Sequence, residues 1–388
     1  MSDLPGIDEA LALVLAHARR LPLEDVAITA AAGRVLAEAA HAVIDLPPFA
    51  SSAMDGYAVR AADTPGPLAV VGHSAAGRPE QRAVGPGEAF VISTGAVVPD
   101  GADAVVPVER TTGEVVVEEV AAGENVRPQG GDTRAGDVVV EAGSVLGPPQ
   151  VSALAAAGVA VVRCARRPRV AVLATGSELR APGEPLALGE IYESNSVLIA
   201  AQLEQSGAQA TVFPPVADDP AATLAALERA LELDVLITSG GVSVGPHDLV
   251  RATLAELGAT EVFWRVAVKP GKPIAFAVRG DTLVFGLPGN PVSALVGLEL
   301  FVRPALRALQ GAREPGPHYL PGRLAQAVPR NAQRDELVRA RRDGDQLAPL
   351  SGQDSHMIVR AAAANALVLV PRGDGDLAQG SQVSYLQI

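Results

Sequence analysis

The sequence contains few cysteines, histidines and lysines, and their scarcity excludes some classes of protein and of metal site. A single cysteine, Cys164, occurs in the 388 residues, so no disulfide can form within the chain, and no CxxC or HExxH spacing offers a zinc site. The six histidines are scattered without metal-ligand spacing. Lysine occurs only at Lys269 and Lys272, and every other basic residue is arginine. These counts exclude a disulfide scaffold and the common zinc sites.

Long hydrophobic runs are also missing. The run at residues 151–162 (VSALAAAGVAVV) is broken by serine and glycine and falls short of the roughly 18 residues that indicate a membrane span. The acidic start, MSDLPGIDE, lacks the pattern of a signal peptide. The net charge of −13 argues against nucleic acid as the main partner, because phosphate backbones are bound by clustered positive charge. We therefore expect a soluble cytoplasmic protein with neither a membrane nor a nucleic-acid partner.

The hydrophobic pattern divides the chain into four parts. Apolar residues at helical spacing predict an amphipathic helix over residues 7–20, and short valine-rich runs between Gly and Pro turns predict an all-β module from about residue 54 to 140. A helix and a strand are predicted over residues 147–162, and the run RCARRPR (163–169) marks a boundary.

From residue 170 onward, strands alternate with capped helices, which is typical of a doubly wound α/β domain, and the final seventy residues predict a small β-barrel. We expect a multi-domain α/β-plus-β protein. Its parts are a helical and stranded N-terminal domain (1–53 and 141–165), an inserted β module (54–140), an α/β domain (166–311) and a C-terminal β-barrel (317–388).

Five loops are predicted to meet at one edge of the α/β sheet. They read TGSEL, ADDP, SGGVSVGPHD, KPGKP and GLPGNP. Ligands of open α/β sheets bind beyond the carboxyl ends of the strands, where glycines let the backbone approach and N–H groups at helix starts favour anions. One such loop alone can be a simple turn. Five on one edge predict a pocket for phosphate or another oxyanion.

Charged residues in these loops suit that pocket. Lysine carries a compact charge that enters a narrow site better than the planar fork of arginine, so Lys269 and Lys272 favour a small tetrahedral anion or a phosphoanhydride; the alternative is a solvated pair. Glu178, Asp218 and Asp248 offer oxygen ligands for Mg²⁺, although solvated loop acids are common. The neighbouring Asp219 is explained by helix capping.

Residues of rare types are informative in this chain, because it is rich in alanine, glycine, proline, valine and arginine. Asn195 and Asn290 fall at predicted helix starts, and Met54 and Tyr57 fall together in SAMDGYA. Any one of these positions can be chance. Together they indicate sites that resist replacement.

These motifs, taken in order, resemble a known family over nearly the whole chain. They are PPFASSAMDGYAVR, STGAVVPDGADAVVPVE, VRPQGGD, TGSEL, SGGVSVGPHD, VKPGKP and GLPGNPVSA, and they resemble the molybdopterin molybdenumtransferases of the MoeA type, a family that includes the E domain of gephyrin. The resemblance implies adenylylated molybdopterin and molybdate as substrates, and molybdenum cofactor and AMP as products. It also implies Mg²⁺ and a homodimer in which the β module of one subunit closes the pocket of the other.

The resemblance assigns roles to particular residues. Asp218, Asp248, Lys269 and Lys272 match catalytic positions, and Asp218, Asp248 and Glu178 match candidate metal ligands. The pterin and its phosphates would be held by Thr175, Gly176, Ser177, Glu178, Ser239, Gly240, Gly241, Ser243, Pro288, Gly289, Asn290 and Ser293. The β-module positions that close the partner's pocket are Asp55, Tyr57, Thr94, Arg127 and Asp132.

Three departures from the family pattern stand out. Ser177 occupies a position where an acidic residue is frequent, and Arg265 one where lysine is common. Pro246 and His247 precede Asp248 where a smaller or acidic pair is usual, and we interpret His247 as a surface residue.

Other functions are compatible with parts of the sequence. The α/β domain alone resembles molybdopterin adenylyltransferases and a damage-inducible nucleotide-hydrolysing family, which lack this four-part plan. A molybdopterin-binding scaffold without turnover could lose Asp218, Asp248 and the lysines, so their retention favours catalysis. A homologue that inserts tungsten is not distinguished by sequence.

Overall fold

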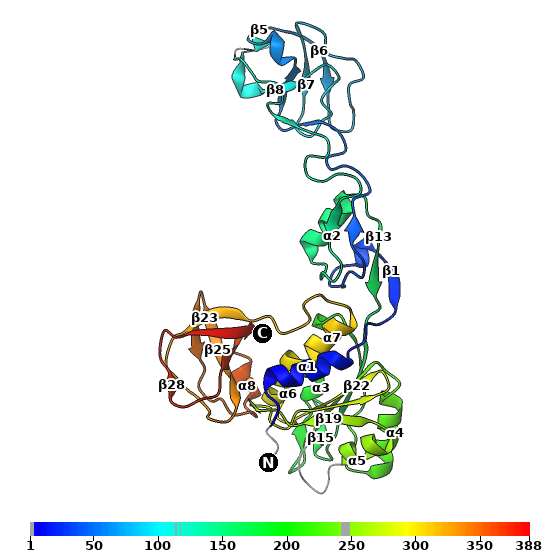
Figure 1. Ribbon diagram of the computed structural model, residues 1–388, viewed down its shortest axis with the longest axis vertical. Helices are drawn as coiled ribbons and strands as arrows, with labels where there is room; N and C mark the ends of the chain where they lie inside the picture. Colours follow the sequence, from blue (N-terminus) through cyan, green and yellow to red (C-terminus); the bar gives the residue numbers. More distant parts are fainter. Residues whose placement is uncertain (1–3, 113–114, 117, 242–248) are drawn as a thin grey trace.

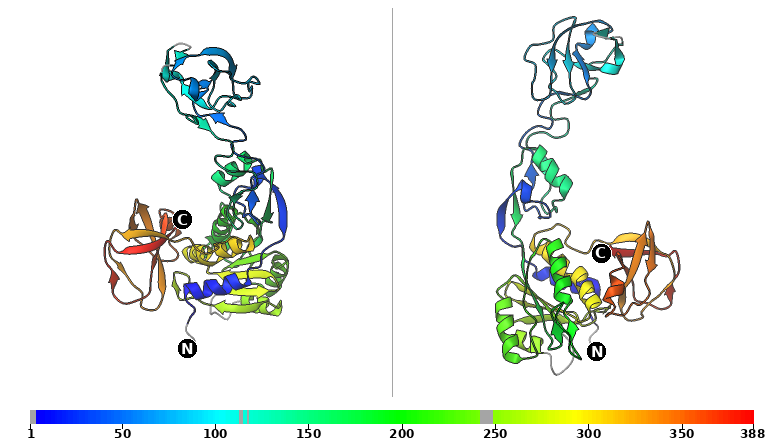
Figure 2. Two further views of the ribbon diagram at one scale, coloured as in Figure 1. Left: turned by 45° about the horizontal axis from the view of Figure 1, so that its top comes forward. Right: turned by 180° about the vertical axis from the view of Figure 1, so that it is seen from behind.

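The protein is elongated, and its four units follow one another in a bent arrangement (Figure 1). The computed structural model describes residues 4–112, 115–116, 118–241 and 249–388. A β module lies at one end, a small mixed unit lies in the middle, and an α/β unit and a β-barrel lie side by side at the other end, as the views in Figure 2 also show. The predicted multi-domain α/β-plus-β architecture is confirmed. The boundaries that we assigned to the domains stay a prediction.

A six-stranded mixed sheet forms the centre of the α/β unit, in the order β17-β14-β18-β22-β21-β19. The strands are β14 (Arg169–Ala174), β17 (Gln209–Val212), β18 (Val235–Ser239), β19 (Thr260–Trp264), β21 (Ala275–Arg279) and β22 (Thr282–Leu287). The first four in the order are parallel, whereas β21 is antiparallel to β22 and pairs Ala275 with Gly286. The loop before β21 and the loop after β22 therefore emerge at the same edge, as predicted.

Helices cover both faces of this sheet because its central strands are apolar on both sides. On one face, α3 (Asn195–Gln205) packs in a core with Val172 and Ile237. On the other face, α4 (Pro220–Ala230) and α5 (Leu249–Glu256) pack in a core with Leu173 and Leu236. Consecutive residues of β14 and β18 thus enter opposite cores. This is the doubly wound arrangement that the alternation of strands and helices predicted.

The first helix, α1 (Ile7–His17), packs on the α/β unit, although we had placed residues 1–53 in the N-terminal domain. Its buried Ile7, Ala10 and Val14 belong to the same core as the sheet and the last helix of the α/β unit. An amphipathic pattern predicts a helix but not its partner, because an apolar stripe can pack on any complementary apolar face.

The helical stretch from Pro291 to Leu309 is interrupted. It consists of α6 (Pro291–Gly297), a π-helical segment (Leu298–Val302) and α7 (Arg303–Leu309). Pro304 has no N–H group to donate to the preceding turn, which breaks the regular bonding. In the π segment, the buried Glu299 accepts hydrogen bonds from Gln202 at 3.0 Å and Arg303 at 2.8 Å. Burial raises the pKa of Glu299, and these partners only partly offset it.

The middle unit is built from two separate stretches of the chain. β1 (Leu23–Ala27) pairs antiparallel with β13 (Val161–Ala165), and β2 (Ala40–His41) pairs with β12 (Val138–Val140). Together with α2 (Pro148–Ala156), they enclose a small apolar core. Because each pair joins a strand before the β module to one after it, the β module is an insertion in this unit.

The β module is all β, as predicted. Its main sheet has the order β6-β7-β4-β8, made of β4 (Gly56–Val59), β6 (Ala69–Ser74), β7 (Glu88–Ile92) and β8 (Ala104–Pro107). A smaller sheet joins β5 (Gly66–Pro67), β9 (Thr111–Thr112) and β10 (Val115–Val116), and β3 (Ser51–Ser52) pairs with β11 (Val126–Arg127). The valine-rich runs supply apolar cores on the two sides of the main sheet.

The C-terminal unit is a closed barrel of five strands, because β25 pairs with both β26 and β27. The strands are β23 (Leu320–Leu324), β25 (Asp335–Asp343), β26 (Gln346–Pro349), β27 (Ala366–Val370) and β29 (Gln382–Gln387). A short strand of the α/β unit, β20 (Val268–Lys269), adds to β25 in parallel. This pairing fixes the barrel against the α/β unit.

Candidate active site

A pocket of about 660 Å³ lies at the carboxyl edge of the parallel strands. Loops after β14, β18 and β22, the start of α3 and part of the barrel unit form its walls. The lining residues are Ala174, Thr175, Glu178, Leu179, Ile191, Tyr192, Glu193, Ser194, Asn195, Ser239, Gly240, Gly241, Pro273, Pro288, Gly289, Asn290, Pro291, His356 and Ile358. Its size lies in the range of about 300 to 1,000 Å³ that small-molecule sites occupy.

Backbone hydrogen bonds hold the strand-end loops together. The N–H of Thr175 donates to Ser239 O at 3.1 Å, and the N–H of Gly240 donates to Leu287 O at 3.1 Å. The N–H of Gly176 donates to Val216 O at 3.0 Å. Val216 belongs to the loop that follows β17. The ends of four neighbouring strands are therefore held as one edge.

Two glycines after β18 allow this close approach. Gly240 and Gly241 have φ angles of +89° and +63°, which residues with a side chain rarely adopt. A Cβ atom at Gly240 would lie 2.8 Å from Thr175 O, and one at Gly241 would lie 2.7 Å from a methyl of Val250. Both positions therefore require glycine for conformation and for space.

Asn195 joins two of the loops through its side chain. Its Nδ2 donates to Ser239 Oγ at 2.7 Å and to Gly289 O at 2.8 Å. Asn195 is buried, and its Oδ1 has no hydrogen-bond partner in the part of the chain that the structure describes. The sequence singled out this asparagine as a rare residue at a helix start, and the structure gives it the role of a clamp.

Some backbone N–H groups in the first turns of the helices at this edge already have hydrogen-bond partners within the protein. Glu193 Oε1 accepts from the N–H of Ser196 at 2.9 Å in the first turn of α3, and Val292 N–H in α6 donates to Ser355 O at 3.1 Å. The protein thus satisfies N–H groups that we expected to face an anion. Asp219 caps α4 as predicted, accepting from Ala222 N–H at 2.7 Å.

A loop of the barrel unit forms one wall of the pocket. His356 and Ile358 line it, and Asn290 Nδ2 donates to Ser355 Oγ at 2.9 Å rather than capping its own helix. The buried Arg339 of β25 holds this loop in place. Its guanidinium donates to the carbonyls of Met357 at 2.8 Å and of Gly352 at 2.7 Å.

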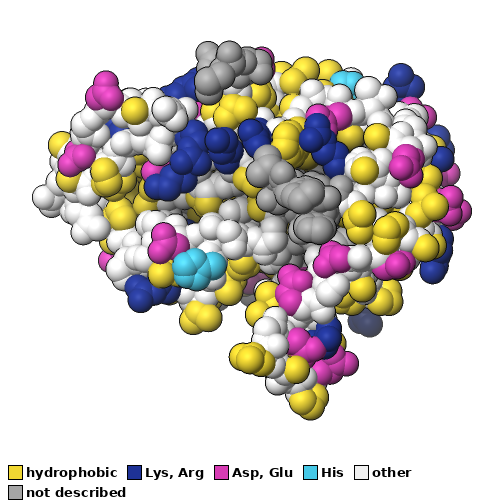
Figure 3. Space-filling model, turned by 90° about the horizontal axis from the view of Figure 1, so that it is seen from below, with side chains coloured by type: hydrophobic (Ala, Val, Ile, Leu, Met, Phe, Trp, Pro, Cys, Tyr) yellow, Lys and Arg dark blue, Asp and Glu magenta, His cyan; other side chains and the backbone are white. Residues whose placement is uncertain are grey.

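Charged side chains gather on the underside of the molecule. Seen from below, several Lys and Arg side chains lie together near the middle of this face, and Asp and Glu side chains are scattered around them (Figure 3). Among the described residues, no helix combines the length and the apolar character that crossing a lipid bilayer requires.

Comparison with known proteins matches three successive stretches of the chain. Residues 6–158 match the MoeA N-terminal region (domain I and II), residues 171–308 a probable molybdopterin binding domain, and residues 321–388 the MoeA C-terminal region (domain IV). The chain is 38% identical over 380 residues to "Molybdopterin molybdenumtransferase 2" of Mycobacterium tuberculosis, covering 92% of this chain and 93% of that protein. The chain belongs to the MoeA family of molybdopterin molybdenumtransferases.

Other relatives agree with this assignment. The "Molybdopterin molybdenumtransferase" of Haemophilus influenzae is 37% identical over 371 residues, which is 91% of each chain. A crystal structure of a molybdopterin biosynthesis MoeA protein from Pyrococcus horikoshii OT3 superimposes over 100% of both chains with a TM-score of 0.83 and 28% identity. The resemblance seen in the sequence motifs is confirmed, and the family is one of transferase enzymes.

The structure of this MoeA-family chain brings together most of the predicted pterin-binding positions. Eight of them line the pocket: Thr175, Glu178, Ser239, Gly240, Gly241, Pro288, Gly289 and Asn290. Gly176 and Ser177 lie between two lining residues, whereas Ser293 is buried inside α6. Ser243 and Asp248 lie outside the described residues, as do Pro246 and His247. The binding roles of these residues stay predictions.

Asp218 lies beside the pocket and is held by Ser177. The Ser177 hydroxyl lies 3.1 Å from Asp218 Oδ2, and Asp218 N–H donates back to Ser177 Oγ at 3.1 Å. The serine that replaces the acidic residue of the family pattern therefore orients a neighbouring carboxylate.

The two lysines that we assigned to one anion have different surroundings. Lys269 is part of β20, and its Nζ lies 2.9 Å from Glu336 Oε1 on the barrel. It lines a second hollow of about 330 Å³ with residues of the barrel, whereas Lys272 is exposed. Because Pro273 lines the main pocket, the KPGKP segment runs between the two hollows.

A metal site is not complete among the described residues. No three His, Cys, Asp or Glu side chains in residues 4–241 and 249–388, outside the short gaps, are close enough to hold a metal ion. Glu178 lines the pocket, Asp218 is already bonded to Ser177, and Asp248 is not described. The described carboxylates alone do not fit a resident Mg²⁺ ion.

The β module, which contains β7 and β8, lies at the far end of the molecule from the α/β unit (Figure 1). Asp55 Oδ1 accepts from Thr94 N–H at 2.7 Å and from its hydroxyl at 3.1 Å, so these two predicted residues are brought together. Arg127 is part of β11 and pairs with Ser51 across the strands. Tyr57 is part of β4, and Asp132 N–H donates to Leu46 O.

The sequence did not predict several residues of the pocket. Tyr192, Glu193 and His356 line it, and Ser355 accepts a hydrogen bond from the lining residue Asn290. His356 and Met357 are adjacent and of rare types, so the reasoning that singled out Met54 could have found them. Tyr192 is one of only four tyrosines, so the same reasoning applies to it, whereas Glu193 carries no comparable signal.

Proposed function

We propose that this protein inserts molybdate into adenylylated molybdopterin, releasing AMP and forming the molybdenum cofactor. The observation that carries the proposal is the pocket at the carboxyl edge, whose glycine loops are clamped by Asn195 in a chain of the MoeA family. A backbone-lined, prearranged edge of this kind suits a ligand with several phosphate oxygens.

The proposed reaction balances in atoms and protons. Hydrolysis of the phosphoanhydride consumes one water, breaks the bond to the adenylyl phosphorus and releases two protons. The two dithiolene sulfurs replace two oxo groups of molybdate, which takes up two protons and releases two waters. The net products are molybdenum cofactor, AMP and one water, and cleavage of the anhydride supplies the driving force.

The protein's part in this reaction is to hold two anions that repel each other. In our proposal, Thr175, Ser239 and Gly240 bind phosphate or pterin, and Lys272 offsets charge at the exposed end of the KPGKP loop. Asp218, oriented by Ser177, faces the same edge. Fixed partners of this kind lower the cost of bringing reactants together.

In this proposal, Mg²⁺ would be bound mainly by the phosphate groups of the substrate. A Mg²⁺ ion bound mainly by phosphate oxygens, with water and one or two protein carboxylates, is the usual arrangement for this metal. Glu178 and Asp218 are the described carboxylates nearest to that role, and Asp248 is the predicted third. We derive no chemical step through the metal, because the described residues do not form its site.

The proposal also includes a homodimer with a shared pocket. Tyr57 is part of β4 and Asp55 and Thr94 flank β4 and β7, so these three belong to the β module, which is distant from the α/β unit of its own chain; Arg127 and Asp132 lie on the segment that returns from it. A role for them in binding therefore requires a second subunit, whose pocket they would close. Sedimentation equilibrium of the purified protein tests this, with a monomer as the outcome that contradicts it.

The reaction is tested by measuring AMP release from adenylylated molybdopterin with Mg²⁺, with and without molybdate. We expect molybdate to stimulate release, and Asn195→Ala to abolish most of the stimulation. Tungstate in parallel shows whether the site accepts the larger metal's oxyanion. Binding of the substrate without release under any of these conditions would contradict the proposal and indicate a scaffold.

A further inference from the structure

A small cavity lies between the α/β unit and the C-terminal barrel. Its volume is about 140 Å³. Its lining residues come from the π-helical segment and α7, from the linker that leads into β23, and from the end of β29. The ionisable ones are Glu299, Arg303, Arg307 and His318. None of the described residues that line this cavity lines the candidate active-site pocket, so the two are separate features of the molecule.

Positive charge exceeds negative charge around this cavity. Arg303 and Arg307 lie four residues apart in α7 and so share one face of the helix. Glu299 is the only carboxylate among the described lining residues. Its Oε1 accepts a hydrogen bond from Gln202 at 3.0 Å, and its Oε2 accepts one from Arg303 at 2.8 Å. The one carboxylate is therefore committed to Arg303 and Gln202, and Arg307 remains as a second cation.

The guanidinium of Arg307 is poorly compensated. This half-buried residue donates one hydrogen bond within the part of the chain that the structure describes, to Gly316 O at 3.2 Å, and forms no ion pair there. Burial lowers the pKa of Arg307, the charge of Arg303 lowers it further, and Glu299 opposes both effects. A half-buried cation without a carboxylate partner costs free energy, which an anion in the adjoining cavity would offset.

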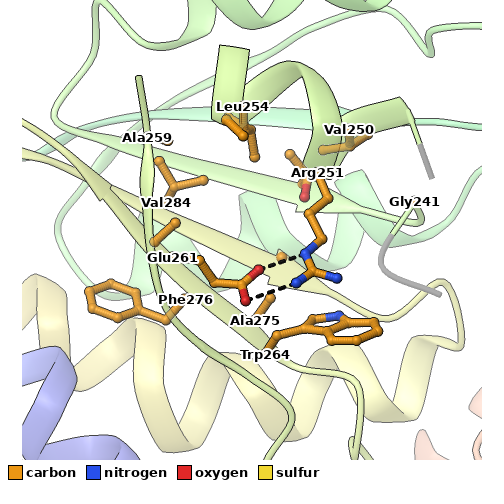
Figure 4. A pocket seen from close by; sticks show the side chains of 14 residues that line it. Gly241, Val250, Arg251, Leu254, Ala259, Glu261, Trp264, Ala275, Phe276 and Val284 are labelled. Atoms are coloured by element: carbon orange, nitrogen blue, oxygen red, sulfur yellow. Dashed lines mark hydrogen bonds and ion pairs between the residues drawn. The ribbon is translucent and has the colours of Figure 1, made fainter. Parts of the chain in front are cut away.

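Arg251 shows how the same kind of side chain is compensated elsewhere in the α/β unit. Its Nε lies 2.6 Å and its Nη2 3.0 Å from the two carboxylate oxygens of Glu261 (Figure 4). The same guanidinium lies 4.1 Å from the centre of the Trp264 ring. A guanidinium fork that meets a pair of anionic oxygens makes one of the stronger interactions in proteins. The described residues offer Arg307 no such pair of oxygens, although it lines a cavity.

The volume of the cavity selects a small ligand. A water molecule occupies about 30 Å³ in the liquid, so the cavity has room for about four or five waters. Sites for drug-sized organic ligands are larger, at about 300 to 1,000 Å³. A tetrahedral oxyanion such as sulfate or phosphate has a suitable size. Its oxygens match the fork of an arginine, and its negative charge offsets the excess of positive charge.

We propose that this cavity binds a small tetrahedral oxyanion, held by Arg303 and Arg307 of α7 and by His318 of the linker. The bound ion joins α7 to the segment that enters the barrel, and so helps to hold the barrel against the α/β unit. Phosphate, sulfate and molybdate share the required chemistry. The inference does not rest on the proposed function, because the site lies outside the candidate active-site pocket and its test uses no pterin.

Isothermal titration calorimetry of the full-length protein with sulfate tests the site, with the ionic strength held constant by sodium chloride. Arg307→Gln removes the poorly compensated cation, and Arg341→Gln, at an exposed position of β25, is the matched control. Lys272→Gln removes a cation from the loop beside the candidate active site, and so tells the two places apart. His318→Glu puts a negative charge at an exposed residue of the cavity, and it serves as the test if Arg307→Gln does not fold.

We expect saturable binding of sulfate that is weakened at least about tenfold, or about 1.4 kcal/mol, in Arg307→Gln and His318→Glu. Binding should be unchanged in Arg341→Gln and Lys272→Gln. Titrations with phosphate and molybdate show which of these ions the site prefers, and acetate, which is planar, should bind more weakly than all three. No saturable binding, equal affinities of the wild type and the cavity variants, loss of binding in Lys272→Gln alone, or acetate binding as tightly as sulfate would overturn the inference.

Discussion

The side-chain amide of Asn195 donates a hydrogen bond of 2.7 Å to the hydroxyl of Ser239. The same nitrogen donates to Gly289 O, so one residue at the start of α3 positions the ends of β18 and β22 together. The loops that follow these strands pass close to each other, since a Cβ atom at Gly289 would lie 3.9 Å from Gly240 Cα. The shape of the candidate active site therefore depends on the contacts of Asn195.

Asn195→Ala should loosen this edge. We expect a loss of stability of about 1 to 3 kcal/mol, because Ser239 loses a buried partner, and a fall in kcat/KM of up to about 100-fold from misplaced loops. Urea denaturation and AMP-release kinetics measure the two effects. Near-normal turnover in a destabilised variant would restrict Asn195 to a structural role.

Asp218 and Asp219 form a matched pair of neighbouring carboxylates. Asp218→Asn should lose most of the activity because it removes a charge at the pocket, whereas Asp219→Asn should retain activity and stability because asparagine caps helices as well as aspartate. Steady-state rates and melting temperatures of both variants test this. Equal activities would remove Asp218 from the proposed site.

Lys269 tests the value of a compact charge. In Lys269→Arg the guanidinium can still pair with Glu336, so we expect an unchanged melting temperature. Most of the activity should be lost, because the resemblance assigns Lys269 a catalytic position, where a planar guanidinium would hold a small tetrahedral anion less closely than a compact ammonium does. Lys272→Arg provides the comparison for the exposed lysine. Near-normal turnover of Lys269→Arg would contradict our interpretation of the KPGKP motif.

Arg339 supports the barrel wall of the pocket from inside the protein. Its pKa is lowered by burial, with the nearby Asp354 carboxylate opposing that shift. Arg339→Lys cannot reproduce its hydrogen bonds and should cost about 3 kcal/mol, while Arg341→Lys, an exposed position of the same strand, should cost almost nothing. Chemical denaturation compares them, and equal stabilities would contradict this role.

Acid stability should depend on Asp234. Burial alone would raise the pKa of this carboxyl, but hydrogen bonds from Arg166 and Arg169 outweigh burial and lower it from 3.8 to about 2. A depressed folded-state pKa contributes stability above about pH 4, and this contribution, about 2 kcal/mol, disappears as pH falls from about 4 to about 2.

The matched variants are Asp234→Asn and Asp25→Asn, the latter removing an exposed ion pair with Arg163. Only Asp234→Asn should flatten the dependence of unfolding free energy on pH in this acidic window. Parallel curves for wild type and Asp234→Asn would refute the assignment.

The parts of the site that could be predicted are local in sequence. Glycines at strand ends, the Asp219 cap and the converging loops follow from short motifs, because turns, caps and parallel-strand edges are decided by a few adjacent residues. The SGG motif predicted the turn at Gly240 and Gly241, and both residues have positive φ angles.

The parts that could not be predicted depend on docking between distant segments. Ser355 accepts a hydrogen bond from Asn290, and Lys269 forms an ion pair with Glu336 of the barrel. No local sequence pattern encodes either contact. The same reason explains why the packing of α1 on the α/β unit was not predicted.

The central claim is that molybdate insertion and release of AMP are one coupled reaction in the clamped pocket. The most direct measurement is the ratio of molybdenum transferred to AMP released in a single turnover of the purified protein with adenylylated molybdopterin. Our account predicts a ratio of one, and little release of AMP when molybdate is omitted. Release of AMP at the same rate without molybdate, or molybdenum bound to the pterin without release of AMP, would contradict it.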